Sequence, residues 1–406
     1  MNDMTTGTAT DTTTGTATDT TTGTATGITT AAAASISAGI PDKVTEQEYL
    51  YWLFQIPNIG IVSMRRLWQE YGSFEAVYNI EGKELKLKKL LHEKSAECFD
   101  TWKGKLAETT EEYCSLPQRG IRFVSVLDEE YPRRLKYLTD APMGLYVKGE
   151  LPGEEAPSVA IIGARNCSNY GKQVAEYMGS ALSRNGILVI SGLAAGIDGA
   201  GHRGALRESN PTFGVLGCGV NICYPKENYC LYEAMVSCGG ILSEYKLGEA
   251  PSPGNFPMRN RIISGLSDVI LVVEAREKSG SLITVEYALE QGKEVFAIPG
   301  PISSSLSKGC NRLIKAGAGM VTSPDDILDF FQLKNDKKLR VHEKNEKSLA
   351  KNEKMLYSCL DLTPKYIEQI MAECGLPIGV CMSILLELEL GGYVTQPASH
   401  YYARTI

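Results

Sequence analysis

Residues 158–171 read SVAIIGARNCSNYG, and this stretch decides the fold. The run SVAII consists of small and β-branched residues, which is typical of a strand buried on both faces. It ends at Gly163, and a glycine directly after such a strand permits the tight turn of a dinucleotide-binding fold. Where that fold has its second glycine, the chain has Arg165. The turn therefore keeps the place of a phosphate-binding turn but puts a cation in it.

Similar short apolar runs recur along the next 160 residues or so, separated by helical stretches. This alternation predicts an α/β fold in which helices cover both sides of a parallel sheet. Residues 121–149 add two strand-like stretches around a YPRRL turn and lead into this core. The candidate core strands are 158–162, 186–190, 212–216, 239–243, 269–273, 294–298 and 319–322.

The region before the core divides into two parts by composition. Residues 1–41 repeat the octad TTGTATDT and lack large apolar side chains, which predicts a disordered tail. Residues 42–120 carry apolar residues at helical spacing on both sides of a PNIG turn. That pattern fits a helix-hairpin-helix element that holds a backbone phosphate near Arg65 and Arg66, but the net charge of −4 over residues 42–157 favours a small helical packing domain.

The core is expected over residues 121–332, and two further parts follow it. Charged residues and asparagine dominate residues 333–354, which predicts a flexible linker. Residues 355–406 read as three helices and a small hairpin, the order of a winged helix. This last part has two basic and five acidic residues, so we expect a protein-contact module or a regulatory lid and not a reader of duplex DNA.

Composition and charge argue against several classes of protein. The 406 residues carry a net charge of −7, and the sequence shows neither a signal peptide nor an apolar run long enough to span a membrane, so we expect a cytoplasmic protein. The eleven cysteines form no CxxC pair and only four histidines accompany them, which argues against a zinc site and favours reduced thiols. We expect no metal, no cofactor and no catalytic residue.

Residues 158–332 carry fifteen basic and sixteen acidic residues, so an anion site there depends on placement. Seven of the fifteen cations follow predicted strands, at the sheet edge where open α/β folds bind ligands. The alternative is that these arginines pair with nearby carboxylates. The cations are Arg165, Lys226, Arg259, Arg261, Lys278, Lys308 and Arg312.

The loops favour phosphate binding over catalysis. The chain has neither the GxGxxG pattern of nicotinamide and flavin enzymes nor the GxxxxGK pattern of a P-loop. Asp198 and His202 stand one helical turn apart and form a conceivable acid–base pair, although a histidine in this position is more commonly part of the core. SGSLIT at 279–284 reads as an anion-cradling loop.

Six long motifs, in order, resemble those of the DNA-processing protein A family, also called DprA or Smf. They are GARNCSNYG, SGLAAGIDGAGHRGAL, GCGVNICYPKEN, SEYKLGEAPSPGNFPMRNRIISGLSD, EAREKSGSLITVEYALEQGKEVFAIPG and SKGCNRLIKAGA. The resemblance covers roughly residues 42–406. It implies an extended Rossmann-like core with a helical domain similar to a sterile alpha motif on its N-terminal side, and no known catalysis.

The resemblance also implies a function: binding and protection of single-stranded DNA during natural transformation, and loading of the recombinase RecA for homologous recombination. It implies a homodimer through the Rossmann-like domain. By motif, Arg165 and Lys226 correspond to the family's DNA-contacting cations, and Arg259 and Arg261 are pocket residues. The full set that we expect to bind DNA adds Lys278, Lys308, Arg312, Gly163, Ser191, Gly192, Ser279 and Gly280, with Tyr170 or Tyr229 available for base stacking.

Two other functions remain open at this point. A phosphoribohydrolase-like nucleotide-processing enzyme would use the loop SGSLITVE with Glu286 as its acid, but the PGGxGTxxE loop of such enzymes is absent. A transcription regulator would need tight duplex binding by residues 355–406, and their acidity argues against it.

Overall fold

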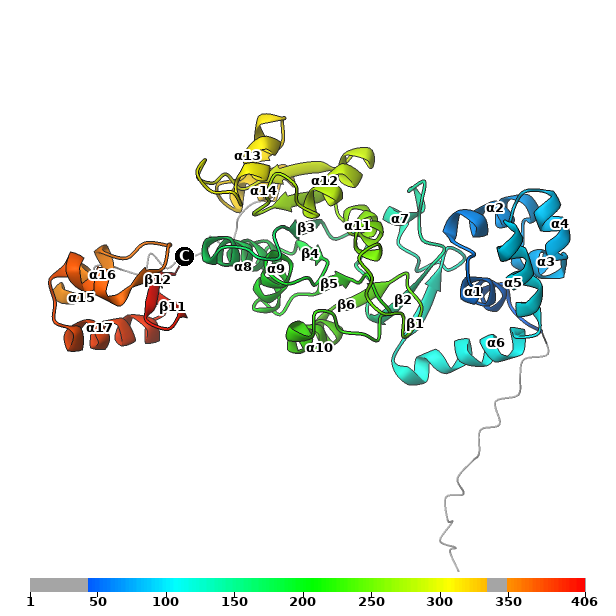
Figure 1. The fold of residues 1–406 in the computed structure, drawn as a ribbon, viewed down its shortest axis with the longest axis horizontal. Coiled ribbons are helices and arrows are strands. Elements are labelled where there is room, and N and C mark those ends of the chain that lie inside the picture. The colour runs from blue at the N-terminus through cyan, green and yellow to red at the C-terminus, as the bar shows by residue number, and fades with distance from the viewer. Residues whose placement is uncertain (1–42, 334–348, 406) are drawn as a thin grey trace, which may run out of the picture. The chain divides into compact units, whose positions relative to one another are not determined.

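The computed structural model describes residues 43–333 and 349–405 (Figure 1). The predicted tail, residues 1–41, lies outside the described residues, and so do residues 334–348 of the predicted linker. All elements below belong to one unit of the chain, Val44–Ile406.

Helices form the region before the sheet. Thr45 and Glu48 make a reciprocal capping box that starts α1, and Gly72, with φ of 75°, ends α2 in a left-handed conformation. The predicted helix, PNIG turn and helix are α1 and α2, and both helices contribute buried residues, among them Trp52 and Leu67, to one core. The elements are α1 (Glu46–Gln55), α2 (Ile61–Tyr71), α3 (Phe74–Asn79), α4 (Gly82–Leu87), α5 (Glu93–Lys103), α6 (Leu106–Ser115) and η1 (Leu116–Arg119).

A sheet of nine strands follows, in the order β1-β2-β6-β5-β4-β3-β7-β8-β9. All seven predicted core strands are present, and every pairing among β3 to β9 is parallel. The two stretches around YPRRL join the same sheet as β1 and β2, with antiparallel pairing between them and from β2 to β6. The mostly parallel α/β prediction is confirmed. The strands are β1 (Arg122–Ser125), β2 (Gly144–Gly149), β3 (Ser158–Ile162), β4 (Leu188–Ser191), β5 (Thr212–Val215), β6 (Gly240–Ser243), β7 (Val269–Val272), β8 (Glu294–Ala297) and β9 (Gly319–Met320).

Helices cover both faces of the sheet, and β3 shows why its sequence is apolar throughout. Val159 and Ile161 point into one core with α8 and α9, whereas Ala160 and Ile162 point into another with α11 and α12. The helices are α7 (Arg133–Lys136), α8 (Asn169–Arg184), α9 (Ile197–Leu206), η2 (Lys226–Asn228), α10 (Tyr229–Cys238), α11 (Asn255–Leu266), α12 (Ser281–Glu290), α13 (Lys308–Lys315) and α14 (Asp325–Phe330).

The strand order reverses between β3 and β7. From β3 the chain builds outward through β4, β5 and β6, and it then returns to β7 on the other side of β3. In open α/β sheets, ligands bind beyond the carboxyl ends of the strands at such a reversal. The fold therefore places the candidate site after Ile162 and Val272.

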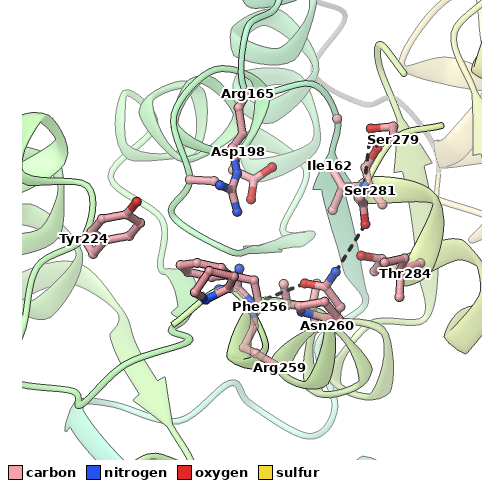
Figure 2. A pocket seen from close by; sticks show the side chains of 17 residues that line it. Ile162, Arg165, Asp198, Tyr224, Phe256, Arg259, Asn260, Ser279, Ser281 and Thr284 are labelled. Carbon is pink, nitrogen blue, oxygen red and sulfur yellow. Dashed lines mark hydrogen bonds between the residues drawn. The ribbon is translucent and has the colours of Figure 1, made fainter. Parts of the chain in front are cut away.

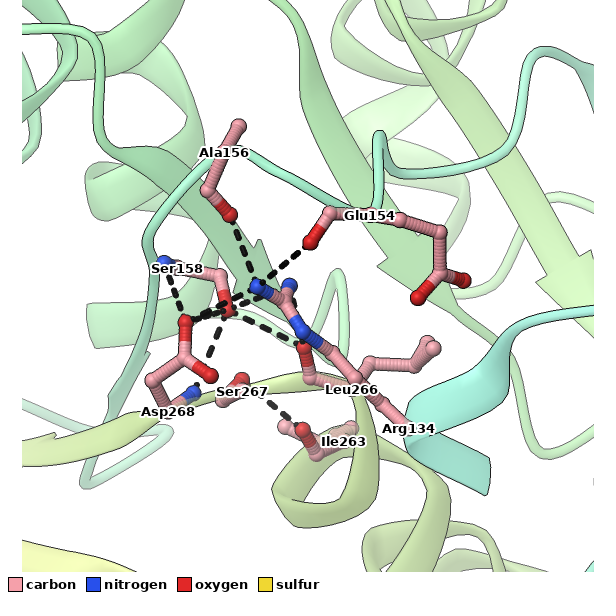
Figure 3. Close-up of polar contacts among 8 residues, drawn as sticks. All are labelled: Arg134, Glu154, Ala156, Ser158, Ile263, Leu266, Ser267 and Asp268. Atoms are coloured by element: carbon pink, nitrogen blue, oxygen red, sulfur yellow. Dashed lines mark hydrogen bonds and ion pairs between the residues drawn. The ribbon is translucent and has the colours of Figure 1, made fainter. Parts of the chain in front are cut away.

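Arg134, from the YPRRL turn, ties α7 to the opposite, amino-terminal edge of the sheet (Figure 3). Its guanidinium donates to Ser158 Oγ at 2.9 Å and to the Ala156 carbonyl at 2.8 Å, and it pairs with Asp268 at 3.0 Å. Ser158 begins β3 and Asp268 immediately precedes β7. One arginine therefore fixes the starts of both strands that border the reversal.

The C-terminal region has the predicted winged-helix order. Three helices precede a hairpin whose strand β12 lies between β10 and β11. No single helix among the described residues is long and apolar enough to cross a membrane, although the bent pair α16 and α17 passes that test on length and composition. The elements are α15 (Lys351–Ser358), β10 (Lys365–Tyr366), α16 (Ile367–Cys374), α17 (Ile378–Leu390), β11 (Val394–Ala398) and β12 (Tyr401–Arg404).

Candidate nucleic-acid interface

A cavity of about 430 Å³ lies at the strand reversal (Figure 2). Figure 2 shows Arg165 and Asp198 on one side, Phe256 and Arg259 opposite them, Tyr224 at one end, and Ser279, Ser281 and Thr284 at the other. These residues come from the segments that follow β3, β4, β5, β6 and β7. Five chain segments that are distant in sequence therefore meet at the sheet edge that the sequence predicts.

The turn after β3 is held from the neighbouring strand. The buried carboxylate of Glu274, two residues beyond β7, accepts hydrogen bonds from the Ser168 backbone N–H at 2.8 Å and from Ser168 Oγ at 2.6 Å. Ser168 Oγ in turn caps α8 by accepting from the Gly171 N–H at 3.0 Å. Gly163 must be glycine because a Cβ there would lie 2.7 Å from Ile197 Cγ1. The rigid turn presents Arg165 to solvent.

Arg165 is part of a cation–aromatic stack. Its guanidinium lies 4.8 Å from the centre of the Phe256 ring, and the Tyr224 ring stacks on Phe256 at 5.6 Å with an interplanar angle of 25°. A second hollow of about 230 Å³ is lined by the same three side chains together with Asn166 and Gly192. The stack thus borders two adjoining hollows, with a positive charge and aromatic planes available to both.

Arg259 lines both hollows but is almost fully buried. It donates to the carbonyls of Gly192, at 2.9 Å, and Val215, and burial lowers its pKa to about 10. Beside it, burial raises the pKa of Asp198, an effect that the charge of Arg259 opposes. A Cβ at Gly192 would lie 2.6 Å from Arg259 Nη2 and 2.7 Å from Asp198 Oδ2, so a larger residue here would displace these two buried side chains. Arg259 and Asp198 are therefore two buried groups in the cavity wall whose charges influence each other.

Arg261 lies elsewhere, in conflict with the expectation that it faces a ligand. Its side chain is fully buried and pairs with Asp140, at 3.1 Å, and with Glu244. Burial raises the pKa of Glu244, and the Arg261 charge opposes that shift. Residues two apart on a helix point about 200° away from each other, so Arg259 and Arg261 on α11 cannot both face the cavity. For Arg261, the alternative of pairing with local carboxylates holds.

The remaining expected cations are exposed and lie outside the two hollows around Arg165. Lys226, in η2, shares a separate hollow with Tyr229, whose side chain is 57% exposed. Lys308 begins α13, and Arg312 on the same helix lies 4.0 Å from Glu277. Lys278 precedes the serine loop. These positions provide charge around the cavity rather than within it.

The serine loop of residues 279–281 closes one end of the cavity. Ser279 Oγ and Ser281 Oγ lie 2.8 Å apart, and both residues line the cavity together with Gly280 at the start of α12. Exposed backbone N–H groups in the first turn of a helix favour an anion. Ser191, by contrast, is fully buried and donates to the Ile161 carbonyl at 2.6 Å, so it supports the sheet and does not reach a ligand.

The sequence did not lead us to predict two residues of the stack, Tyr224 and Phe256. Tyr224 and Phe256 follow different strands, and each precedes a proline, a local signal that gives no indication of stacking. Of the aromatic residues named as stacking candidates, Tyr229 shares its hollow with Lys226, whereas Tyr170 packs against the core beneath α8.

His202 belongs to the core. It is fully buried, and its Nδ1 lies 2.7 Å from Thr212 Oγ1. Because the Thr212 hydroxyl donates to the Val189 carbonyl at 2.7 Å, Nδ1 carries the proton and donates to Thr212. Burial lowers the pKa of His202 to about 3. Among the described residues, no three His, Cys, Asp or Glu side chains are grouped so that they could hold a metal ion.

Taken together, a doubly wound sheet, a cation–aromatic cavity at its reversal point and a winged helix define a Rossmann-like protein with an added winged helix. Comparison with known proteins identifies its family. The family model described as DNA recombination-mediator protein A matches residues 122–332, and that of the DprA winged helix domain matches residues 341–398. The chain belongs to this family of DNA-processing proteins, as its motifs indicate.

Individual relatives agree with this assignment. Protein Smf of Escherichia coli strain K12 is 38% identical over 296 residues, which cover 71% of this chain and 79% of that protein. DNA processing protein DprA of Streptococcus pneumoniae is 45% identical over 208 residues, covering 51% of this chain and 73% of the relative. An X-ray structure of DprA from Streptococcus pneumoniae aligns with a TM-score of 0.62 and 36% identity over 71% of this chain and 98% of that structure.

Proposed function

We propose that the chain binds single-stranded DNA at the reversal-point cavity, without catalysis, and delivers it to the recombinase RecA in the cytoplasm during natural transformation. The observation that carries the proposal is the exposed guanidinium of Arg165 lying over Phe256, with Tyr224 stacked beside it. Strand binding without sequence preference combines cations for phosphates with aromatic planes for bases, and the stack supplies both.

Charge placement supports a strand over a compact ligand. Lys226, Lys278, Lys308 and Arg312 are exposed around the cavity and do not line its two hollows. A mononucleotide held in one hollow would leave these cations unused, whereas successive phosphates of a strand can reach separated charges. We assign Arg165 and Lys226 as the principal phosphate contacts and Gly163, Gly192, Ser279 and Gly280 as wall positions.

The salt dependence of binding tests this proposal. For a single strand, each phosphate contact makes the slope of log K against log salt more negative by about 0.7. If Arg165, Lys226, Lys278, Lys308 and Arg312 each neutralise one phosphate, the slope is about −3.5, and affinity falls roughly a hundredfold between about 50 and 200 mM salt. Anisotropy of a labelled oligothymidylate measures this slope.

Arg165→Gln should weaken binding and make the slope shallower by about 0.7. Arg133→Gln is the matched control, because Arg133 is also exposed but adjoins Arg134 at the opposite edge of the sheet. Equal slopes for wild type, R165Q and R133Q would overturn the assignment of the site. If the slope stays unchanged whichever of the five cations in or around the cavity is replaced, the proposed function is overturned.

Three further parts of the proposal need their own measurements. Sedimentation velocity tests the homodimer through the Rossmann-like domain, and the rate of RecA filament formation on protein-coated single strands tests loading. We also propose boundaries near residues 42, 120 and 332. The expected end of the linker at residue 354 falls inside α15, so we place the last boundary before Lys351. Limited proteolysis tests these boundaries, since cleavage is expected first in exposed linkers.

A further inference from the structure

Helix α17 in the winged helix carries a row of exposed apolar side chains. Ile378, Met382, Leu386 and Leu390 are 57, 38, 57 and 81% exposed, and residues spaced by four lie along one face of a helix. Exposed apolar residues are ordinary when scattered singly, but a continuous row marks an interaction surface. We call these four residues the exposed row.

The core of the winged helix does not account for the exposed row. A different face of α17, formed by Cys381, Ile384, Leu385 and Leu388, is buried against α15, α16 and the hairpin. That face alone gives the amphipathic pattern that a helix on a small core needs. The exposed row is therefore a second apolar face.

The charges on α17 and in the chain that follows it argue against nucleic acid as the occupant of the row. Residues 355–405 contain two cations, and both are engaged within this region. Lys365 pairs with Asp361 at 3.1 Å and Glu373 at 2.8 Å, while Arg404 donates to the Tyr357 carbonyl at 2.8 Å and lies over the Tyr357 ring. Within residues 355–405 no cation is left for phosphates, which supply most of the affinity for DNA, and the exposed Lys351 and Lys354 lie on α15 and not on α17.

Negative charge gathers at one end of the row. Glu387 and Glu389 are exposed on α17 beside Leu386 and Leu390. The C-terminal end of a helix also carries the negative pole of its macrodipole. A partner whose cations lie next to this end gains electrostatic energy, and one with carboxylates there is repelled.

We propose that the exposed row of α17 binds a basic amphipathic helix of a partner protein, with the apolar face of the partner on the row and its lysines or arginines at Glu387 and Glu389. A helix laid along another helix presents side chains at the same four-residue spacing as the row. The inference goes beyond the proposed function and does not depend on it.

The test uses the full-length protein and a fluorescein-labelled synthetic peptide of about 18 leucines and lysines, five helical turns long, with its leucines on one face. A peptide of the same composition in scrambled order and one with glutamate in place of lysine serve as controls. Anisotropy should show tight binding only for the amphipathic basic peptide. The variant L386S/L390S should bind it at least about tenfold more weakly, the loss expected when two exposed leucines that the peptide would cover are removed.

Two more variants separate the apolar from the electrostatic part. E387Q/E389Q should weaken binding about threefold and reduce its salt dependence, since exposed pairs contribute less than about 1 kcal/mol each. Ser383→Asn changes an exposed residue of α17 outside the row and should leave binding unchanged. All these sites are exposed, so the variants should fold, which circular dichroism checks.

Four results would overturn the proposal. One is equal binding by wild type and L386S/L390S, and another is equal binding of the scrambled or acidic peptide. A dimer that L386S/L390S converts to monomers in sedimentation velocity would make a second copy of the chain the occupant. Binding to phosphatidylcholine or phosphatidylserine vesicles that L386S/L390S abolishes would make it a membrane surface.

Discussion

Replacing Arg259 by methionine should destabilise the sheet while leaving a cavity of similar shape. The substitution leaves the buried Asp198 without its countercharge and the carbonyls of Gly192 and Val215 without a donor. Leaving a buried charge without the opposite charge that compensates it typically costs about 3–5 kcal/mol of unfolding free energy. We expect a loss of this size at neutral pH.

The pH dependence gives the sign of the effect. Burial raises the pKa of Asp198, and removal of Arg259 raises it further because the opposing charge is gone. When a carboxyl group binds its proton more tightly in the folded state than in the unfolded state, the protein loses stability as pH rises. R259M should therefore be closest to wild type near pH 5 and furthest from it near pH 8. The double variant D198N/R259M should regain part of the lost unfolding free energy. It should also lose most of the pH dependence, because asparagine does not titrate.

The measurement of stability must report on the unfolding of the sheet. The three tryptophans, Trp52, Trp68 and Trp102, all lie in the N-terminal helices, so their fluorescence reports another region. Far-ultraviolet circular dichroism, with hydrogen exchange of peptides from β4 and β5, measures the right transition. Arg165→Met is the matched control, because Arg165 is exposed in the same cavity and should change stability by less than about 0.5 kcal/mol. Two results would contradict this role of Arg259: R259M no less stable than R165M, or D198N/R259M as unstable as R259M at pH 8.

Three other substitutions probe the supports of the fold. Ser168→Ala removes the cap of α8 and a partner of Glu274, and should cost about 1–2 kcal/mol of unfolding free energy, measured by urea titration followed by circular dichroism. His202 has a folded pKa of about 3, so protonation of the unfolded chain should remove about 1.4 kcal/mol per pH unit below about pH 6.5. His202→Gln should flatten that part of the stability profile, and an unchanged slope would contradict the assignment. Arg134→Lys keeps a charge near Asp268 but loses the fork that also reaches Ser158 and Ala156, so the melting temperature should fall; an unchanged melting temperature would show that one contact suffices.

The core strands and the winged helix were predictable because their signals are local. Val/Ile runs such as 158–162 and 269–273 can be buried on both faces only in a covered parallel sheet. The antiparallel edge was not predictable, because β2 pairs with β6 almost a hundred residues away and no local pattern specifies that partner. The sequence likewise shows Arg259 and Arg261 in one motif, but their separation depends on Asp140 and Glu244, which the fold brings to one side of α11.

The absence of a second glycine after β3 now has a physical explanation in the position of Glu274. In dinucleotide-binding folds the pyrophosphate sits at the N-terminus of the helix that follows the first strand. Here the Glu274 carboxylate accepts from Ser168 N–H and Oγ at that helix terminus, and a Cβ at Gly171 would lie 2.4 Å from it. The chain's own anion fills the place that a bound pyrophosphate would take. Under the proposed function, a phosphate binds further out, where Arg165 reaches solvent over Phe256, and an open position of this kind suits a strand that passes through better than a cofactor that stays bound.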